Sequence, residues 1–390
     1  MKILLGITGG IAAYKTPQLV RLLVKKGHNV RVILTEKAKD FVTPLTLSTL
    51  SKEPVLSDFA TIDGEWNSHV ALAQWADLLL IAPATANTIA KMASGQCDNL
   101  LLATYFSAKK PVWVAPAMDL DMYAHPTVTE NLIKLERFGN HIIPATYGEL
   151  ASGLVGQGRM AEPEDIVASI ETALQEALPL KGKKILITAG PTYQAIDPVR
   201  FIGNFSTGKM GIALANEAVR QGAEVHLVLG PSAEKNIDNK IHLHKVVSAQ
   251  QMYEAAVAQF ETCDMAILAA AVADYTPAEV APQKIKKKGD ELILTLIPTV
   301  DILASLGKLK TTQKLIGFAL ETENEVENAQ LKLQKKNLDA IVLNSLRDKG
   351  AGFGTDTNKI TFITAQQLQE FPLKHKEAVA KDILQKCMSL

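Results

Sequence analysis

The feature that most restricts the fold is a pattern that occurs twice in the chain. Each half opens with an apolar run, a glycine-containing turn, an amphipathic stretch and a second apolar run. The first copy is KILLGITGGIAAYKTPQLVRLLVKKGHNVRVILT from Lys2, and the second begins with KKILITAGPT at Lys183. This order predicts strand, helix and strand, joined by a right-handed crossover between parallel strands. We therefore expect two units that are each built on a parallel sheet.

Further apolar runs extend both halves. The first half adds DLLLIAP, PVWVAP and HIIPA, and the second adds MAILAAA, KLIGFAL, AIVLN and KITFIT. Strands that alternate with helical segments predict the α/β class, with two doubly wound, Rossmann-like domains. We place the boundary in LPLKGKK at 178–184, which gives domains at 1–180 and 181–390. In such sheets, ligands bind outside the carboxyl ends of the strands.

Composition restricts the partners and the compartment. The 390 residues are too many for one ordinary core, and 41 Lys and Arg balance 41 Asp and Glu. A formal net charge of zero gives no overall attraction to nucleic acid or to an acidic membrane. No apolar run approaches the about 20 residues of a membrane helix. Cys97, Cys263 and Cys387 form no CxxC pair, which argues against disulfides and structural zinc. We expect a cytoplasmic protein without nucleic-acid or membrane partners.

The turn after the first apolar run could hold a phosphate. TGGIA, from Thr8 to Ala12, offers a hydroxyl, two glycines and a helix start, which suits an anion. It is not GxGxxG, and glycine also serves turn geometry alone, so an NAD-linked oxidoreductase is not indicated. Thr35 closes the next run. Glu36 after it could bind a ribose hydroxyl, but without the dinucleotide fingerprint we interpret it as the start of a helix.

Three later segments of this half carry unusual residues. PATANT, at 83–88, leaves room for a planar group beside a strand end, although Thr and Asn are also ordinary helix caps. His69 begins the amphipathic stretch HVALAQWAD, where a single histidine is usually structural. In APAMDLDMYAHP, Asp119 follows an apolar run directly. A carboxylate is costly there unless it caps a helix or meets a ligand.

Taken together, TGGIAAYKTP, HVALAQWAD, APATANT and PAMDLDMY resemble the flavin-dependent cysteine decarboxylase family over roughly residues 1–175. That family binds FMN and oxidatively decarboxylates a C-terminal cysteine. The resemblance implies that His69 is the active-site histidine. It also implies an FMN site lined by Gly9, Gly10, Thr35, Ala84, Thr85 and Ala86.

Two positions depart from the family pattern. Many members have Asn where this chain has Asp119, and a proton-donating Cys where the register against GQGRM places Ser152. An ionised Asp119 would be repelled by a substrate carboxylate by about 4 kcal/mol at about 4 Å and an effective dielectric constant of about 20. We hypothesise that Asp119 is protonated when substrate is bound and also supplies the proton that Ser152 supplies poorly. The alternative is a decayed decarboxylase, which the otherwise intact motifs disfavour.

The second half contains an apparent phosphate loop. GNFSTGK, from Gly203 to Lys209, satisfies GxxxxGK, but Met210 stands where a P-loop needs Ser or Thr, and the preceding DPVRFI is a poor strand. We therefore reject a Walker site. A loop of small residues that opens a helix still suits phosphates, and Arg200, Asn204 and Lys209 could donate hydrogen bonds to them.

Charged residues follow later strands of this half. Asp274, in AAAVADYTP, is either a cap or a ligand of the type that Mg²⁺ prefers. KIKKKGD at 284–290 is ordinarily a solvated hairpin. Lys332 and Lys336 are four residues apart, so they share one face of the predicted helix VENAQLKLQKKNLD. Each cluster could face phosphates or only solvent.

The segments ITAGPT, IDPVRFIGNFSTGKMG, AAAVADYTPAEVAPQKIKK, GFALET and KKNLDAIVLN resemble phosphopantothenate–cysteine ligase over nearly all of 183–365. A ligase behind a flavin decarboxylase is the arrangement of the bacterial bifunctional coenzyme A biosynthesis family. The resemblance implies Mg²⁺ bound by Asp274, and turnover of the activated intermediate by Asn204 with Arg200 nearby. It also implies CTP contacts from Asp274, Lys284, Val300, Asp301, Ile302, Leu303, Phe318, Lys332 and Lys336.

The resemblance also implies the reactions and the assembly. 4′-Phosphopantothenate and cysteine would be joined with CTP through an acyl-cytidylate, and FMN-dependent decarboxylation of 4′-phosphopantothenoylcysteine would give 4′-phosphopantetheine. Trimeric decarboxylase contacts and dimeric ligase contacts would make a homo-oligomer, by analogy a dodecamer. The competing class is a flavin-binding regulatory subunit. His69 and the complete ligase half argue against it.

Overall fold

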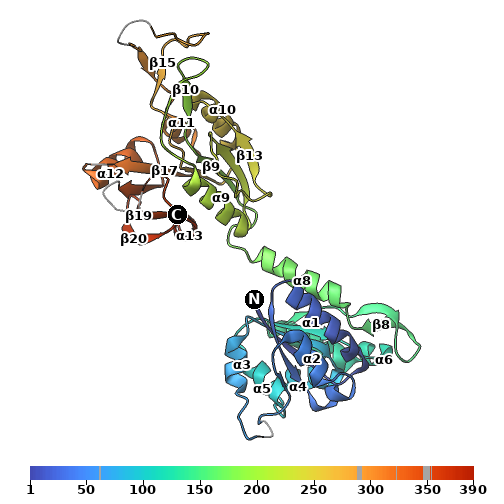
Figure 1. Cartoon of the computed structure of the whole chain (residues 1–390). Coiled ribbons are helices and arrows are strands. Elements are labelled where there is room, and N and C mark those ends of the chain that lie inside the picture. Colours follow the sequence, from blue (N-terminus) through green and yellow to red (C-terminus); the bar gives the residue numbers. More distant parts are fainter. Residues whose placement is uncertain (61–62, 288–291, 322, 346–351, 353) are drawn as a thin grey trace. The chain divides into compact units, whose positions relative to one another are not determined.

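The computed structural model describes the chain except for residues 61–62, 288–291, 322, 346–351 and 353. Two compact units, Met1–Leu174 and Gln175–Leu390, account for it. Both are α/β units (Figure 1), so the predicted fold class is confirmed. Within the described residues, none of the helices combines the length and apolar character needed to cross a bilayer.

The first unit is built on six parallel strands in the order β3-β2-β1-β4-β5-β6. Central strand β1 pairs with β2 on one side and β4 on the other, so Ile3 faces both Val30 and Leu78. Helices cover both faces of the sheet, which explains why these strands are continuous apolar runs. The strands are β1 (Lys2–Ile7), β2 (Asn29–Leu34), β3 (Val55–Leu56), β4 (Leu78–Ala84), β5 (Val112–Pro116) and β6 (His141–Ile142).

Two separate cores show how the helices of the first unit divide between the faces. One core is formed with α1 (Thr16–Lys25), α2 (Pro44–Ser51) and α8 (Pro163–Glu176). The other is formed with α3 (His69–Trp75), α4 (Ala86–Ser94), α5 (Leu100–Ser107) and α7 (Pro126–Arg137). The remaining elements are η1 (Ile11–Lys15), η2 (Glu36–Asp40), α6 (Leu120–Ala124) and the antiparallel hairpin of β7 (Thr146–Glu149) and β8 (Val155–Arg159).

The second unit has an eight-stranded sheet in the order β13-β12-β9-β14-β17-β18-β19-β20. The first six strands are parallel, and β19 and β20 are antiparallel. The KITFIT run therefore forms a strand as predicted, but the parallel arrangement ends at β18, because β19 pairs with it in the antiparallel direction. These strands are β9 (Lys184–Ala189), β12 (Glu224–Leu229), β13 (His242–Lys245), β14 (Met265–Leu268), β17 (Lys314–Glu321), β18 (Ala340–Ser345), β19 (Thr357–Ile363) and β20 (Leu368–His375).

Helices again cover both faces of the second sheet. One core includes α9 (Lys209–Arg220) and α13 (Lys376–Cys387), which pack against each other. The opposite core includes α10 (Ala249–Phe260), α11 (Ile302–Leu309) and α12 (Glu325–Lys335). Two small hairpins complete the unit: β10 (Tyr193–Ala195) with β11 (Phe201–Gly203), and β15 (Tyr275–Pro277) with β16 (Leu296–Pro298).

The strand order places one ligand site in each unit. In both sheets the order reverses between the first strand and its later neighbour, β1 beside β4 and β9 beside β14. The loops that leave these strands diverge to opposite faces and open a crevice between them. Hydrogen bonds hold these loops together in the first unit: the Thr8 hydroxyl donates to the carbonyl of Pro83 at 2.7 Å and accepts from the N–H of Thr85 at 3.0 Å.

Gly211 is the position where helix α9 comes closest to the sheet. A Cβ added there would lie 2.4 Å from the Cβ of Ala189 and 3.1 Å from the carbonyl oxygen of Thr188. We expect Gly211→Val to destabilise the second unit by about 1–3 kcal/mol, because the extra atoms force the helix away from β9. Differential scanning calorimetry should show a Tm lower by several degrees. Arg220→Ala, at the exposed end of the same helix, is the matched control, and equal effects of the two variants would contradict this role of Gly211.

Two candidate active sites at the carboxyl ends of the sheets

A cavity of about 890 Å³ lies at the carboxyl ends of β1, β4 and β5. Most of the residues that the sequence predicts for the flavin site line this cavity. Ala84 is the exception, because it is fully buried at the end of β4 and does not line the cavity. The predicted residues that do line it are Gly9, Gly10, Thr35, Thr85 and Ala86.

The residues of this cavity suit a ligand that carries a phosphate. A Cβ on Gly9 would lie 2.4 Å from the Cβ of Lys37, so the loop after β1 closes only with glycine there. Helix α4 begins after Thr85, and no side chain caps its first turn. The free backbone N–H groups of that turn lie beside the cavity, which Ala86 and Asn87 line. Such N–H groups, with the positive end of the helix dipole, bind phosphate.

Asp119 serves as a helix cap and as part of the cavity wall. Its Oδ1 accepts a hydrogen bond from the N–H of Leu120 at 2.7 Å and starts α6. Within the described part of the chain its Oδ2 makes no hydrogen bond. The N–H of Met118 donates to the carbonyl of Gly158 at 3.0 Å, which ties this loop to β8. One carboxylate oxygen is therefore structural, and the other remains for a ligand.

Ser152 lies in the turn of the β7–β8 hairpin. It is exposed, and its Oγ accepts from the N–H of Leu154 at 3.4 Å. It does not line the cavity, although its neighbours Leu150 and Ala151 do. The structure therefore places the predicted proton-donor position at the rim, on a short hairpin beside the cavity.

His69 stands apart from the cavity wall in the single chain. It is the first residue of α3, after Ser68, whose Oγ accepts from the N–H of Ala71 at 3.2 Å. Its ring lies edge-on to Phe59, with 6.2 Å between the ring centroids. Its Nδ1 is buried and has no hydrogen-bond partner among the described residues. Leaving a buried polar atom unsatisfied costs about 1–3 kcal/mol, so this atom calls for a partner that the described residues do not supply.

The second unit has a cavity of about 590 Å³ beside β14 and β17. A further cavity of about 380 Å³ shares Asp274, Phe318 and Lys332 with it and extends to Asn204 and Lys209. Lys284 lines neither cavity, and the later part of its segment, Lys288–Asp290, lies outside the described residues. All other residues predicted for CTP line the larger cavity: Asp274, Val300, Asp301, Ile302, Leu303, Phe318, Lys332 and Lys336.

Two lysines, Lys332 and Lys336, and two aspartates, Asp274 and Asp301, carry the charge of this cavity. Lys332 Nζ donates to the carbonyl of Phe318 at 3.3 Å, and burial together with the charge of Lys336 lowers the pKa of Lys332. Lys336 Nζ lies 2.7 Å from Asp301 Oδ2. Burial alone would raise the pKa of Asp301, but the hydrogen bonds from Lys336 and from the N–H of Ala304 hold it below its ordinary value. The charge of a polyanion bound beside the two lysines would stabilise protonated Lys332.

The loop before α9 is tied to the strand ends but is not a Walker loop. Strand β11, which precedes it, belongs to the β10–β11 hairpin and not to the sheet. Asn204 Nδ2 donates to the carbonyls of Ala271 and Val272, each at 3.1 Å, so the loop is fixed to the segment before Asp274. The structure therefore lacks the sheet strand that a Walker site requires.

Arg200 acts on the segment that contains Lys284 and not on the cavity directly. Its Nη1 lies 2.8 Å from Asp197 Oδ2 and 3.1 Å from the carbonyl oxygen of Ile285. Asp197 is buried. Burial alone would raise the pKa of Asp197, but the backbone N–H groups of Val199, Ile285 and Arg200 hold it below its ordinary value. Arg200 is thus a positioning residue for the 284–287 segment.

The structure adds residues that the sequence did not single out. Asn344 and Asn358 each have a buried side-chain oxygen without a partner among the described residues, and both line the smaller cavity. Buried Lys376, whose pKa burial lowers, lines it as well. The position of Asn344 at the end of the AIVLN run was a usable signal, because ligands gather at strand ends. Asn358 and Lys376 come from β19 and α13, where no sequence pattern pointed to a site.

Fold and cavities together define a class of protein, a two-domain α/β protein with one ligand site per unit at the carboxyl ends of parallel strands. Family models match both units: "Flavoprotein" covers residues 1–175, and "DNA/pantothenate metabolism flavoprotein C-terminal domain" covers 180–390. The coenzyme A biosynthesis bifunctional protein CoaBC of Bacillus subtilis (strain 168) is 46% identical over 392 residues, which is 100% of this chain and 97% of the relative. The chain belongs to this family of bifunctional coenzyme A biosynthesis proteins.

Other relatives match all or part of the chain. A protein named cysteine/cysteine sulfinic acid decarboxylase, from an unknown prokaryotic organism, is 55% identical over 356 residues, which is 90% of this chain and 99% of the relative. A crystal structure of the C-terminal domain of CoaBC is 44% identical, covers 55% of this chain and 97% of that chain, and has a TM-score of 0.47. The FMN binding protein AtHal3 is 32% identical, covers 45% of this chain and 97% of that chain, and has a TM-score of 0.39.

The buried carboxylate of Asp197 predicts a dependence of stability on pH. Its folded-state pKa lies below the ordinary value of about 3.9. Its charged form therefore stabilises the folded state above that ordinary value, and the contribution is lost as the pH falls through the folded-state pKa. We expect Asp197→Asn to have a lower Tm than the parent at neutral pH, and the difference to shrink below about pH 4. Thermal unfolding at several pH values measures this. Exposed Glu279→Gln should show no such difference, and a gap for Asp197→Asn that does not change with pH would contradict the assignment.

Proposed function

We propose that the chain catalyses two consecutive steps of coenzyme A biosynthesis. Residues 181–390 would join cysteine to 4′-phosphopantothenate with CTP, and residues 1–180 would decarboxylate the product, 4′-phosphopantothenoylcysteine, to 4′-phosphopantetheine. The observation that carries the proposal is similarity to a bifunctional relative over the whole length of both chains. The grouping of the predicted residues in one cavity per unit supports it.

For the decarboxylase unit we propose FMN as the cofactor. The glycine turn after β1 and the uncapped start of α4 would hold its phosphate, and the small side chains of Thr85 and Ala86 leave room for a flat ring. When bound, FMN supplies the oxidation that makes loss of the substrate carboxylate easy. The residues of the chain orient the substrate: the free oxygen of Asp119, when protonated, donates a hydrogen bond to the substrate carboxylate and later provides a proton.

For the ligase unit, the proposed chemistry needs positive charge beside a triphosphate. The carboxylate of 4′-phosphopantothenate attacks the α-phosphate of CTP, and pyrophosphate leaves. Lys332 and Lys336 offset the negative charge that develops, as fixed cations do in phosphoryl and nucleotidyl transfer. Asp274 lines both cavities, and its carboxylate is the kind of group that holds Mg²⁺ next to substrate phosphates.

The second half-reaction is attack of the cysteine amine on the acyl-cytidylate, which releases CMP. The unpartnered oxygens of Asn344 and Asn358 support a place for this amine, because they are buried acceptors beside the cavity. Lys209 and Lys376 line the same cavity and can balance the cysteine carboxylate. Asn204 fixes the loop on which the intermediate is handled.

We also propose a homo-oligomer, with trimeric contacts between decarboxylase units and dimeric contacts between ligase units. Trp66 is 64% exposed and Val70 is 44% exposed, and both lie within three residues of His69 in the sequence. An interface over these side chains would bring His69 to the cofactor bound by a neighbouring subunit and give its buried nitrogen a partner. The cytoplasm is the proposed compartment, since all three cysteines are free thiols.

A second candidate function comes from the 55% identical relative. Its name assigns it decarboxylation of cysteine or cysteine sulfinic acid. A free amino acid of this kind presents the same carboxylate beside a sulfur group, but it has no use for the nucleotide cavity of the second unit. The retained lysines of that cavity, Lys332 and Lys336, therefore favour the first candidate.

Mass spectrometry of the products distinguishes the candidates. Purified full-length protein with FMN and Mg²⁺ is given 4′-phosphopantothenate, cysteine and CTP, and 4′-phosphopantetheine is expected. Accumulation of 4′-phosphopantothenoylcysteine alone would reject the decarboxylase assignment. Cysteamine from cysteine, or hypotaurine from cysteine sulfinic acid, formed without CTP, would establish the second candidate.

Asp119→Asn tests the proton-donor role. Asparagine keeps the helix cap and the hydrogen bond to the substrate but cannot give up a proton. We expect an unchanged KM for 4′-phosphopantothenoylcysteine and a kcat lower by about 10²-fold, the usual effect of losing a general acid. Exposed Asp121→Asn on the same helix is the matched control, and CTP-dependent ligation by the same preparations should be unchanged. A kcat equal to that of the parent enzyme would remove Asp119 as the proton donor.

A further inference from the structure

Three histidines and a glutamate gather on two neighbouring strands of the second unit. Strand β12 carries Glu224 and His226, which are two residues apart and therefore point to the same face of the sheet. Strand β13 carries His242 and His244, and the register places His242 opposite His226. Strand β13 is the edge of the sheet. The cluster lies toward the amino-terminal ends of the strands, away from the carboxyl ends where the nucleotide cavity opens.

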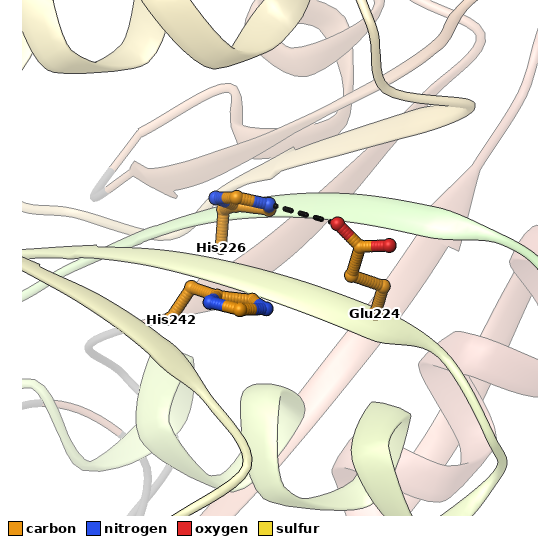
Figure 2. Close-up of side chains that lie close together, drawn as sticks. All are labelled: Glu224, His226 and His242. Carbon is orange, nitrogen blue, oxygen red and sulfur yellow. Dashed lines mark hydrogen bonds and ion pairs between the residues drawn. The ribbon is translucent and has the colours of Figure 1, made fainter.

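The side chains are close enough to share one ion. The rings of His226 and His242 stack with 4.8 Å between centroids and 20° between planes. The carboxylate of Glu224 lies beside the same edge of both rings (Figure 2), with its Oε1 3.3 Å from His226 Nε2. One ligand atom from each of the three residues lies within 4.8 Å of the other two.

The donor set matches borderline divalent metals. Two imidazole nitrogens and one carboxylate oxygen are ligands that zinc accepts in tetrahedral sites with an open fourth position. Bonds of about 2.0–2.1 Å in a tetrahedron place ligand atoms about 3.3 Å apart. The observed separation of His226 Nε2 from Glu224 Oε1 is already 3.3 Å. Only His242 has to move closer, and it is an exposed side chain on an edge strand.

His244 lies beside the second ring nitrogen of His226. Its Nε2 lies 3.2 Å from His226 Nδ1. Metal-bound histidines usually donate their second ring N–H to a fixed partner. If Nδ1 of His226 donates to His244, the lone pair of its Nε2 faces the Glu224 oxygen, and a cation between the two acceptors relieves their repulsion.

The ammonium group of Lys184 lies beside the carboxylate of Glu224. Its Nζ lies 3.4 Å from Glu224 Oε1, and its side chain is 46% exposed. A metal ion would take the place of this exposed ammonium group, which can move into solvent. Removing the lysine charge should therefore strengthen metal binding.

We propose that Glu224, His226 and His242 form a binding site for a divalent transition metal such as Zn²⁺, with His244 as the hydrogen-bond partner of His226. The ion would join β12 to edge strand β13 and so stabilise the second unit. Its nitrogen ligands distinguish it from the oxygen-ligand Mg²⁺ proposed at Asp274. The site does not depend on the proposed function.

The test is a Zn²⁺ titration of full-length, untagged protein that has been stripped with a chelator and kept in Mg²⁺ buffer. A Cys97→Ser background removes the exposed thiol as a competing ligand. Calorimetry should show one Zn²⁺ bound per chain, and the Tm should rise with Zn²⁺, because a ligand that binds only the folded state stabilises it. His226→Ala and His242→Gln should each weaken binding by about 10-fold or more. Lys184→Gln should tighten it.

The control is His141→Ala, because His141 lies in the first unit, with its ring against Trp113. It should bind Zn²⁺ like the parent. Circular dichroism checks that the variants fold, and His242→Gln keeps the test valid if His226→Ala does not, because His242 is exposed. The proposal is overturned if Zn²⁺ does not bind, or if His226→Ala and His242→Gln both bind it as the parent does.

Discussion

The pairing of two parallel strands at the centre of each sheet determines where the ligand cavity of each unit forms. β1 pairs with β4 and β9 with β14, and both pairs are buried on both faces. Their carboxyl ends release loops in opposite directions, so backbone groups at the start of the next helices are left beside a crevice. Side-chain hydroxyls link the loops that follow the paired strands. Thr8 bonds to the loop after β4, and Thr192 accepts from the N–H of Ala273 at 2.9 Å. Both cavities depend on these contacts.

The two cavities use this common frame in different ways. The first offers glycines and small side chains at the start of two helices, and four acids, Asp119 among them, line its wall together with four basic residues. The second places two lysines side by side: burial and the charge of Lys336 lower the pKa of Lys332, and Asp301 anchors Lys336. A flat cofactor is recognised by shape and by N–H groups, whereas a triphosphate is recognised by cations. The two cavities suit different ligands because different residues line them.

Much of the fold could be read from the sequence, because buried parallel strands are long apolar runs and their helices are amphipathic. The predicted nucleotide residues other than Lys284 line one cavity, and their prediction came from the family resemblance and not from the strand pattern. The antiparallel end of the sheet was not predictable, as periodicity carries no strand direction. Asn358 and Lys376 were missed with it. The cluster around His226 depends on the register of β12 against β13, which no local pattern encodes.

At position 119 the fold restricts the shape of the side chain but not its charge. One oxygen of Asp119 starts α6, and the residue lines the cavity. Asparagine caps helices as well as aspartate does, whereas Ala or Val at this position would lose the cap. Selection for folding therefore narrows the position to a few side chains of nearly the same shape. Among these, a change of one atom alters charge and acidity without moving the backbone. A single substitution can therefore replace Asn by Asp at this position without changing the conformation of the loop.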